Sequence, residues 1–203
     1  IPRVDHDLAV IEKAAQDGRE TVRRIQEFSR TRRDKNFEPV DLCEILKDAL
    51  EITKTRWKDD ALLRKVCITP VFQQSAGLRI LGNASELREV FTNLILNAVD
   101  AMPQGGRLEV SCRSDGEQVI AQVTDTGVGM SESVRQNIFD PFFTTKGASG
   151  MGLGMSVVYG IVTRHGGTID VETALAKGTT FTLTFKTTRE FQVAAEGSDG
   201  AAL

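Results

Sequence analysis

The order of the expected helices and strands is the feature that most narrows the folds open to this chain. Period-two alternation predicts strands over residues 37–41, 66–71, 78–81, 108–113, 118–125, 168–172 and 179–187. Helical periodicity predicts helices over about residues 42–57, 85–102, 131–138 and 153–164, with Asp41 as the N-cap of the first. Because helices and strands do not alternate regularly, a doubly wound parallel sheet is disfavoured. We expect an α+β fold, a two-layer α/β sandwich with helices on one face of a mostly antiparallel sheet.

One long helix is predicted ahead of this domain. Apolar or small residues recur there at alternating spacings of four and three, at Val4, Leu8, Ile11, Ala15, Gly18, Val22 and Ile25. So narrow a stripe is buried only against partner helices, in a bundle or a dimer. The chain is therefore expected to divide into a helix with a hinge (residues 1–35), an α/β domain (residues 36–188) and a flexible tail (residues 189–203).

Composition narrows the classes of function. The formal net charge is −3, so a nucleic-acid partner is not expected, and no apolar run is long enough for a membrane span. The chain begins at Ile1 without a methionine, which suggests a fragment of a longer protein. Its three cysteines are widely spaced and form no C-x-x-C pair, so we expect buried free thiols rather than zinc ligands or disulfides.

The helix expected over residues 85–102 carries two stripes. Val90, Phe91, Leu94, Ile95 and Ala98 form an apolar face, and Glu86, Glu89, Asn93, Asn97 and Asp100 form a polar one. A solvated outer face is the simpler interpretation of the polar stripe. However, asparagine is a poor helix former, and two asparagines lie one turn apart in mid-helix. Asparagine side-chain oxygens are suitable ligands for Mg²⁺, which usually also binds nucleotide phosphates.

A second segment, Asp125-Thr126-Gly127-Val128-Gly129-Met130, follows a predicted strand. An aspartate at this point can accept a hydrogen bond from an exocyclic amine. The glycines permit positive φ angles and a close approach of the backbone to a flat ring. A strand end with a tight turn has the same composition, so this segment alone leaves both interpretations open.

The third and fourth segments follow one another directly. Three phenylalanines in Phe139-Asp140-Pro141-Phe142-Phe143 are expected to anchor a mobile segment, and Lys146 is placed to reach a phosphate. A small hydrophobic cluster is the alternative. Residues 147–156 are rich in glycine and lead into a helix, which favours an anion site. The spacing matches neither a Walker A loop nor a dinucleotide fingerprint, so we expect a lid that closes over phosphates.

These four segments, in this order and spacing, resemble the N, G1, F and G2 boxes of sensor histidine kinases. Those kinases belong to the ATPase superfamily that includes DNA gyrase B, Hsp90 and MutL. The N box corresponds to residues 89–98, Gly178-Thr179-Thr180-Phe181 resembles a third glycine motif, and the resemblance covers about residues 37–187. It implies the Bergerat ATP-binding fold, with ATP and Mg²⁺ held between the N-box helix and the lid. It also identifies the first helix as the second helix of a dimerisation and phosphotransfer hairpin.

The resemblance assigns roles to single residues. Asn97 matches the Mg²⁺ ligand, Asn93 lines the phosphate region, and Asp125 matches the adenine-binding aspartate. The full ATP site that it implies consists of Asn93, Asn97, Asp100, Asp125, Gly127, Gly129, Met130, Phe139, Lys146, Gly150, Met151, Gly152, Leu153, Gly154 and Thr180. Of these, Asn93, Asn97 and Lys146 form the catalytic set. Met151 stands where the family often has Thr or Ser, so Ser149 or Ser156 is a candidate substitute for the missing hydroxyl.

Asn93 bears on the choice between kinase and ATPase. Hydrolytic relatives carry a glutamate at this position, and an asparagine cannot act as a base. Glu89 lies a further turn away, about 6 Å along the helix. The expected function is therefore that of a cytoplasmic protein-histidine kinase, with a response-regulator receiver domain as partner and a homodimer formed through the hairpin. A hydrolytic ATPase and a catalytically silent nucleotide-binding scaffold remain alternatives.

The chain has two histidines that bear on the phosphate acceptor. His6 is followed by Asp7, as in a phosphoacceptor motif, but the acceptor of the family lies on the first helix of the hairpin. We therefore expect the acceptor histidine on a helix that this chain lacks. His165 follows a predicted helix, and we expect it to be a structural turn residue.

Overall fold

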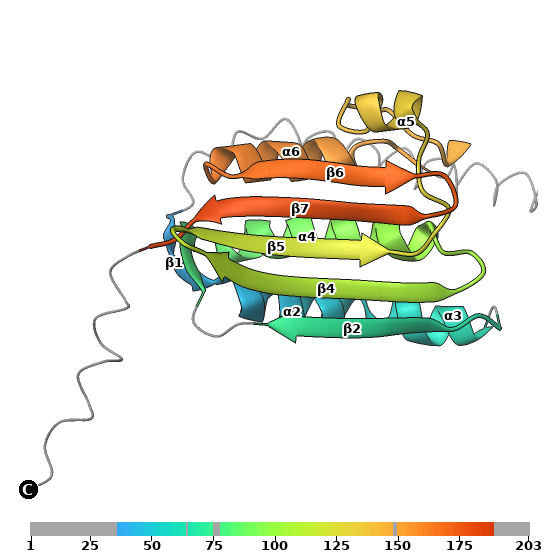
Figure 1. The fold of residues 1–203 in the computed structure, drawn as a ribbon, viewed down its shortest axis with the longest axis horizontal. Helices are drawn as coiled ribbons and strands as arrows, with labels where there is room; N and C mark the ends of the chain where they lie inside the picture. Colours follow the sequence, from blue (N-terminus) through green and yellow to red (C-terminus); the bar gives the residue numbers. More distant parts are fainter. Residues whose placement is uncertain (1–35, 64, 75–77, 148–149, 189–203) are drawn as a thin grey trace, which may run out of the picture.

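A computed structural model of the chain describes residues 36–63, 65–74, 78–147 and 150–188. Its main sheet is five-stranded, in the order β2 (Ile68–Gln74), β4 (Gly106–Asp115), β5 (Gln118–Asp125), β7 (Gly178–Lys186) and β6 (Thr168–Ala174). The β2–β4 pair is parallel and the other neighbours are antiparallel. Three helices, α2 (Leu42–Ile52), α4 (Ala84–Asp100) and α6 (Gly154–Arg164), cover one face of this sheet (Figure 1). The predicted two-layer α+β sandwich is confirmed.

Two predicted strands form a second, smaller sheet. β1 (Glu38–Asp41) pairs antiparallel with β3 (Arg79–Gly82), and neither belongs to the five-stranded sheet. A single bridge between Ile80 and Thr187 links β3 to the residue after β7. The existence of both strands was predictable from alternation, whereas their pairing with each other was not.

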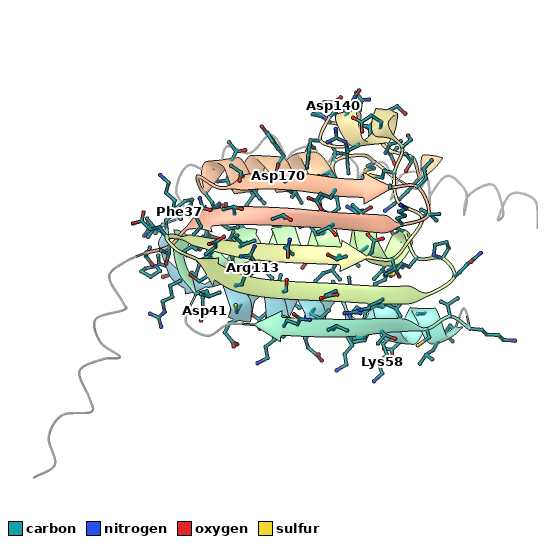
Figure 2. The ribbon with its side chains drawn as sticks, viewed as in Figure 1. Phe37, Asp41, Lys58, Arg113, Asp140 and Asp170 are labelled. Carbon is teal, nitrogen blue, oxygen red and sulfur yellow. The ribbon has the colours of Figure 1, made fainter. Side chains whose placement is uncertain are left out.

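The core lies between the main sheet and the three helices. Alternate residues of the central strands point inward and are buried, as in Leu108, Val110 and Cys112 of β4. The opposite face of the sheet is polar: Arg113 of β4 and Asp170 of β6 are exposed there (Figure 2). One face of the sheet is therefore covered and the other is solvated, which explains the period-two pattern in the sequence.

The first predicted helix is shorter than expected. Asp41 caps it as predicted, since its Oδ1 accepts hydrogen bonds from the amides of Cys43 (2.9 Å) and Glu44 (3.3 Å). The helix ends at Ile52 with Thr53 as its C-cap, where both the amide (3.1 Å) and the hydroxyl (2.8 Å) of Thr53 donate to the Ala49 carbonyl. A π-helical turn, η1 (Thr55–Asp59), and a short helix, α3 (Asp60–Leu63), follow.

The expectation of three buried thiols is wrong for one of them. Cys43 and Cys112 are buried free thiols, but Cys67 is exposed. Cys67 lies just before β2, where its backbone carbonyl accepts a hydrogen bond from the Gly106 amide at 2.9 Å while its side chain remains outside the core. A hydrogen bond with Cys43, together with burial, raises the pKa of Cys112 far above its ordinary range.

Several predictions lie outside the described residues. These are the long helix and hinge of residues 1–35, His6, Ser149 and the tail of residues 189–203. Among the helices that the structure does describe, none has the length and apolar character needed to cross a bilayer.

Candidate nucleotide site

A cleft of about 990 Å³ lies between α4 and α6 and extends to the end of β5. This volume is at the upper end of the range usual for small-molecule sites. The segment that connects β5 to α6, including the short helix α5 (Glu132–Asn137), borders the cleft. Most of the predicted ATP residues line it: Asn93, Asn97, Asp100, Asp125, Gly129, Met130, Lys146, Gly150, Met151, Gly152, Leu153 and Gly154.

The two asparagines of α4 have fixed side-chain orientations. Asn93 Nδ2 donates to the Glu89 carbonyl at 3.0 Å, and Asn97 Nδ2 donates to Met155 Sδ at 3.1 Å. Asn97 Oδ1 accepts from Lys146 Nζ at 3.0 Å, which is consistent with its amide nitrogen facing the sulfur. Each amide nitrogen is therefore engaged within the protein, and the Asn97 oxygen accepts from Lys146.

These oxygens are chemically suited to Mg²⁺. The metal prefers hard oxygen ligands and usually keeps several waters, so one or two protein oxygens are sufficient. The Asp100 carboxylate lies one turn after Asn97 and also lines the cleft. The residues present thus fit a divalent cation bound together with phosphates.

Asp125 stands at the carboxyl end of β5, on the right in Figure 1. Its Oδ1 accepts the amide of Gly127 at 2.8 Å, and the carboxylate also accepts the backbone amide of Thr179, its partner residue on β7. Asp125 is only 4% exposed. Burial raises the pKa of this carboxyl above its ordinary value, while the two amide hydrogen bonds oppose the shift. A buried acceptor that borders the cleft can recognise an exocyclic amine.

Three of the predicted ATP residues do not line the cleft. Gly127 packs closely against Ala101 and Asp125: a side chain there would collide with the Ala101 carbonyl and with Asp125 Oδ1. Phe139 packs against Tyr159 of α6, with ring centroids 5.4 Å apart. Thr180 lies on the opposite face of the sheet, where its hydroxyl is 3.0 Å from that of Thr124.

Thr179, not Thr180, belongs to the cleft. Thr179 is buried, lines the cleft and lies opposite Asp125 in the β5–β7 register. The sequence contained the signal for this assignment. Phe181, Leu183 and Phe185 are the inward residues of β7, so period-two alternation places Thr179 on their face and Thr180 on the other.

The phenylalanine-rich segment and the glycine-rich segment are joined. The Phe142 amide donates to the Gly152 carbonyl at 3.0 Å. Both residues have positive φ angles, +68° for Phe142 and +66° for Gly152, and a side chain at Gly152 would overlap the Phe142 backbone. Backbone strain of this kind at a non-glycine residue is typical of functional segments.

The N-terminus of α6 faces the cleft without a capping side chain. Leu153 stands at the N-cap position and makes no side-chain hydrogen bond to the helix. The Ser156 hydroxyl donates to the Leu153 carbonyl at 2.9 Å, so it is a poor substitute for the hydroxyl missing at Met151. Thr144, which the sequence interpretation omitted, lines the same part of the cleft. An uncapped helix N-terminus that borders a cleft is suited to binding anions.

Glu86 does not belong to the polar stripe of the cleft. It is completely buried, and its Oε2 accepts from Arg164 Nη2 at 2.5 Å. It lies in the first turn of α4, and its partner Arg164 belongs to α6. Arg164 itself lines the cleft, so this ion pair joins the cleft wall to the core.

His165 is a structural residue, as expected. It is the C-cap of α6, its Nδ1 lies 2.8 Å from the Ile161 carbonyl, and its Nε2 accepts the Asn83 amide at 3.0 Å. Its ring stacks on Phe37 with centroids 4.4 Å apart, at the end of the molecule that carries β1 (Figure 2). Burial lowers the pKa of His165.

Comparison with known proteins gives a consistent result. Residues 82–189, slightly more than half of the chain, match the family "Histidine kinase-, DNA gyrase B-, and HSP90-like ATPase". Sensor histidine kinase ZraS of Klebsiella oxytoca is 41% identical over 147 residues, which is 72% of this chain and 30% of that protein. Sporulation kinase C of Bacillus subtilis is 32% identical over 145 residues, 71% of this chain and 33% of that protein. The chain thus spans about a third of the length of these relatives.

Solved structures are similar over most of the described residues. The mycobacterial sensor histidine kinase MprB has a TM-score of 0.64 at 28% identity, over 74% of this chain and 97% of that one. Full-length ShkA in complex with AMPPNP has a TM-score of 0.74 at 24% identity, over 89% of this chain and 38% of that one, which shows a shared fold. On the match of more than half its length, together with the cleft, the chain belongs to the family of histidine kinase-, DNA gyrase B- and HSP90-like ATPases.

Proposed function

We propose that this chain binds Mg·ATP in the cleft and transfers the γ-phosphate to a histidine side chain of a protein. The observation that carries the proposal is Asn93. Its Nδ2 is engaged by the Glu89 carbonyl, and no proton acceptor stands at this position, one turn before Asn97. Such a site can hold ATP and metal without activating water. The sensor-kinase relatives, at 41% and 32% identity, support the same function.

In this proposal the protein contributes positioning and charge. Asp125 accepts the exocyclic amine of adenine, and Asn97 Oδ1 is the metal ligand. Lys146 and the uncapped amides at the start of α6 bind phosphate oxygens. Mg²⁺ would neutralise charge on the transferred phosphoryl group. The nucleophile arrives from outside the cleft, because the described residues of the cleft wall include no histidine.

The proposed partners follow from the same chemistry. The acceptor histidine is proposed to lie on the first helix of a dimeric hairpin, to which residues 4–33 are expected to contribute the second helix. A response-regulator receiver domain then takes the phosphate. A solved histidine kinase in complex with a response regulator has a TM-score of 0.67 at 22% identity to this chain. Because ATP is the donor, we place this activity in the cytoplasm.

A hydrolytic ATPase is the second candidate, and one observation favours it. Glu89 lines the same cleft as the two asparagines, so a carboxylate is present in the cleft although not at the position of Asn93. The choice depends on whether Glu89 can orient water, which a rate measurement resolves.

The test combines binding with two rates. We expect the chain to bind ATP with Mg²⁺, and Asn97→Ala and Asp125→Ala to weaken binding by about 10- to 100-fold, as for loss of a hydrogen bond to a charged group. Unchanged affinity in both variants would remove the site assignment. With γ-labelled ATP we expect a slow steady ATPase rate and acid-labile label on a histidine hairpin supplied in trans. Rapid hydrolysis that is lost in Glu89→Gln would establish the ATPase instead.

The chain also provides a test of its own histidines. Little self-labelling is expected, because His6 is assigned to the second helix of the hairpin and the acceptor to the first. Acid-labile self-labelling that disappears in His6→Ala would show that His6 is the acceptor.

A further inference from the structure

Lys146 forms a bridge across the metal-binding side of the cleft. Its Nζ donates to Asn97 Oδ1 at 3.0 Å and to Asp100 Oδ2 at 2.7 Å. The lysine comes from the segment before α6, whereas Asn97 and Asp100 lie one turn apart on α4. An amide oxygen and a carboxylate oxygen thus converge on one positively charged nitrogen.

The Asp100 carboxylate is held in this orientation from its other side. Arg56 Nη2 of η1 donates to Asp100 Oδ1 at 3.0 Å, which leaves Oδ2 directed at Lys146. Asp100 is 30% exposed, so solvent only partly screens these charges. The carboxylate is therefore a fixed acceptor, placed by one cation and facing another.

The positively charged Lys146 Nζ occupies the position where a metal ion could bind. An amide oxygen next to a carboxylate oxygen is also a suitable ligand pair for a hard divalent metal. The proposed function needs Asn97 Oδ1 for Mg²⁺. Two cations on the same oxygens repel each other, so Lys146 and a metal cannot both remain there.

We propose that Asn97 and Asp100 form a cation-exchange site, in which the Lys146 ammonium and a divalent metal ion compete for the same two oxygens. The inference rests on the proposed function and extends it, since it adds Asp100 to the metal site and gives Lys146 a second position. Without nucleotide, Lys146 occupies the pair. With Mg·ATP, Lys146 leaves the pair for the phosphate oxygens.

The exchange has a consequence for ligand order. A free metal ion must expel Lys146 while offering it no new partner. Mg·ATP supplies phosphate oxygens, and Lys146 can form new ion pairs with them in place of its contacts to Asn97 and Asp100. The site therefore discriminates against metal alone and accepts the metal–nucleotide complex.

The test measures Mn²⁺ binding without nucleotide, by the electron paramagnetic resonance of free Mn²⁺. Lys146→Met keeps the aliphatic stem and removes the competing charge. We expect it to bind Mn²⁺ about two- to fivefold more tightly than the unchanged chain, which corresponds to loss of a partly exposed ion pair. Adding Asp100→Asn to Lys146→Met should abolish this gain, since the carboxylate is the second acceptor.

The matched control is Lys54→Met. Lys54 pairs with Glu51 at 2.7 Å, the same distance as Lys146 to Asp100, and both lysines are 42% exposed. Lys54→Met changes the net charge by the same amount as Lys146→Met, but Lys54 does not line the cleft. Equal Mn²⁺ affinities for Lys146→Met and Lys54→Met would overturn the exchange, and so would a gain that persists in the double variant.

Failure of the exchange differs from failure of the proposed function. If the unchanged chain binds Mg·ATP but Lys146→Met has no effect on Mn²⁺ binding, the exchange is wrong and the function stands. If the unchanged chain binds no ATP with Mg²⁺, the function itself fails. Urea unfolding of each variant verifies that differences in metal binding do not arise from loss of fold.

Discussion

Asn97 and Met155 lie on different helices and are linked by a hydrogen bond from Asn97 Nδ2 to Met155 Sδ at 3.1 Å. The sulfur holds the amide so that Oδ1 faces Lys146. Met155→Leu keeps the volume but removes the acceptor, so stability should change by less than about 1.5 kcal/mol. Nucleotide affinity with Mg²⁺ should fall by about fivefold, as for loss of one hydrogen bond. Calorimetric titration of the chain with ATP measures the change.

The metal dependence of this effect separates orientation from packing. With Mg²⁺ chelated, the Met155→Leu variant and the unchanged chain should bind nucleotide with equal affinity, since Asn97 then has no metal ion to coordinate. An equal loss with and without metal would mean that Met155 acts only by filling space next to the nucleotide.

Asp125 should make stability depend on pH. Burial raises its pKa, so the folded chain binds this proton more tightly than the unfolded chain does. Its ionised form therefore destabilises the folded state at neutral pH, and this penalty disappears as the pH falls through the raised pKa. Asp125→Asn retains an oxygen for the Gly127 amide but carries no charge. Its urea midpoint should exceed that of the unchanged chain at pH 8, and the difference should shrink toward pH 4.

His165 should make stability depend on pH with the opposite sign. Burial lowers its pKa, so the unfolded chain binds the proton more readily. The contribution of His165 is fully present above the unfolded pKa of ~6.5 and is lost as the pH falls below it. Protonation also removes the acceptor at Nε2 for the Asn83 amide. Urea unfolding between pH 5 and pH 8 should show this loss in the unchanged chain and not in His165→Gln.

Arg164 should be essential for stability because of its buried partner. Glu86 is 0% exposed, and its second oxygen, Oε1, has no hydrogen-bond partner within the described structure. Arg164→Met leaves an uncompensated buried carboxylate, and the free energy of unfolding should fall by about 3 kcal/mol. The double variant Glu86→Leu with Arg164→Met should recover most of this loss. A double variant no more stable than Arg164→Met would show that the arginine stem, rather than its charge, is what matters.

The sequence predicted the elements well because the strands and helices carry strong, regular patterns. The inward residues of β4 and β7 are mostly apolar, and Asp41 and Ser131 cap their helices as polar residues should. The pairing of the strands with one another was harder to predict from the sequence. The parallel β2–β4 contact and the separate β1–β3 sheet depend on where the chain returns in space, which alternation within one strand does not encode.

The cleft was predicted in outline, since most of its residues belong to ordered segments of recognisable composition. The differences between the predicted residues and the cleft lining have physical reasons. The glycine motif favours Thr180, whereas strand alternation places Thr179 on the side of the cleft. Glu86 satisfied the polar periodicity of α4, but its partner Arg164 is 78 residues away in the chain. Met155 was missed because sulfur is a weak acceptor and its role depends on the approach of α6 to α4.

The pairing of Asp125 with Thr179 also affects folding kinetics. β4 and β5 are joined by two residues, so their hairpin is a local contact, whereas Thr179 reaches Asp125 only after the chain has passed through α5 and α6. Pairings between residues distant in sequence pay their loop-closure cost before they stabilise the fold. The end of the cleft that is proposed to bind adenine is thus expected to be completed late in folding. Bound nucleotide should then slow unfolding more than it speeds folding.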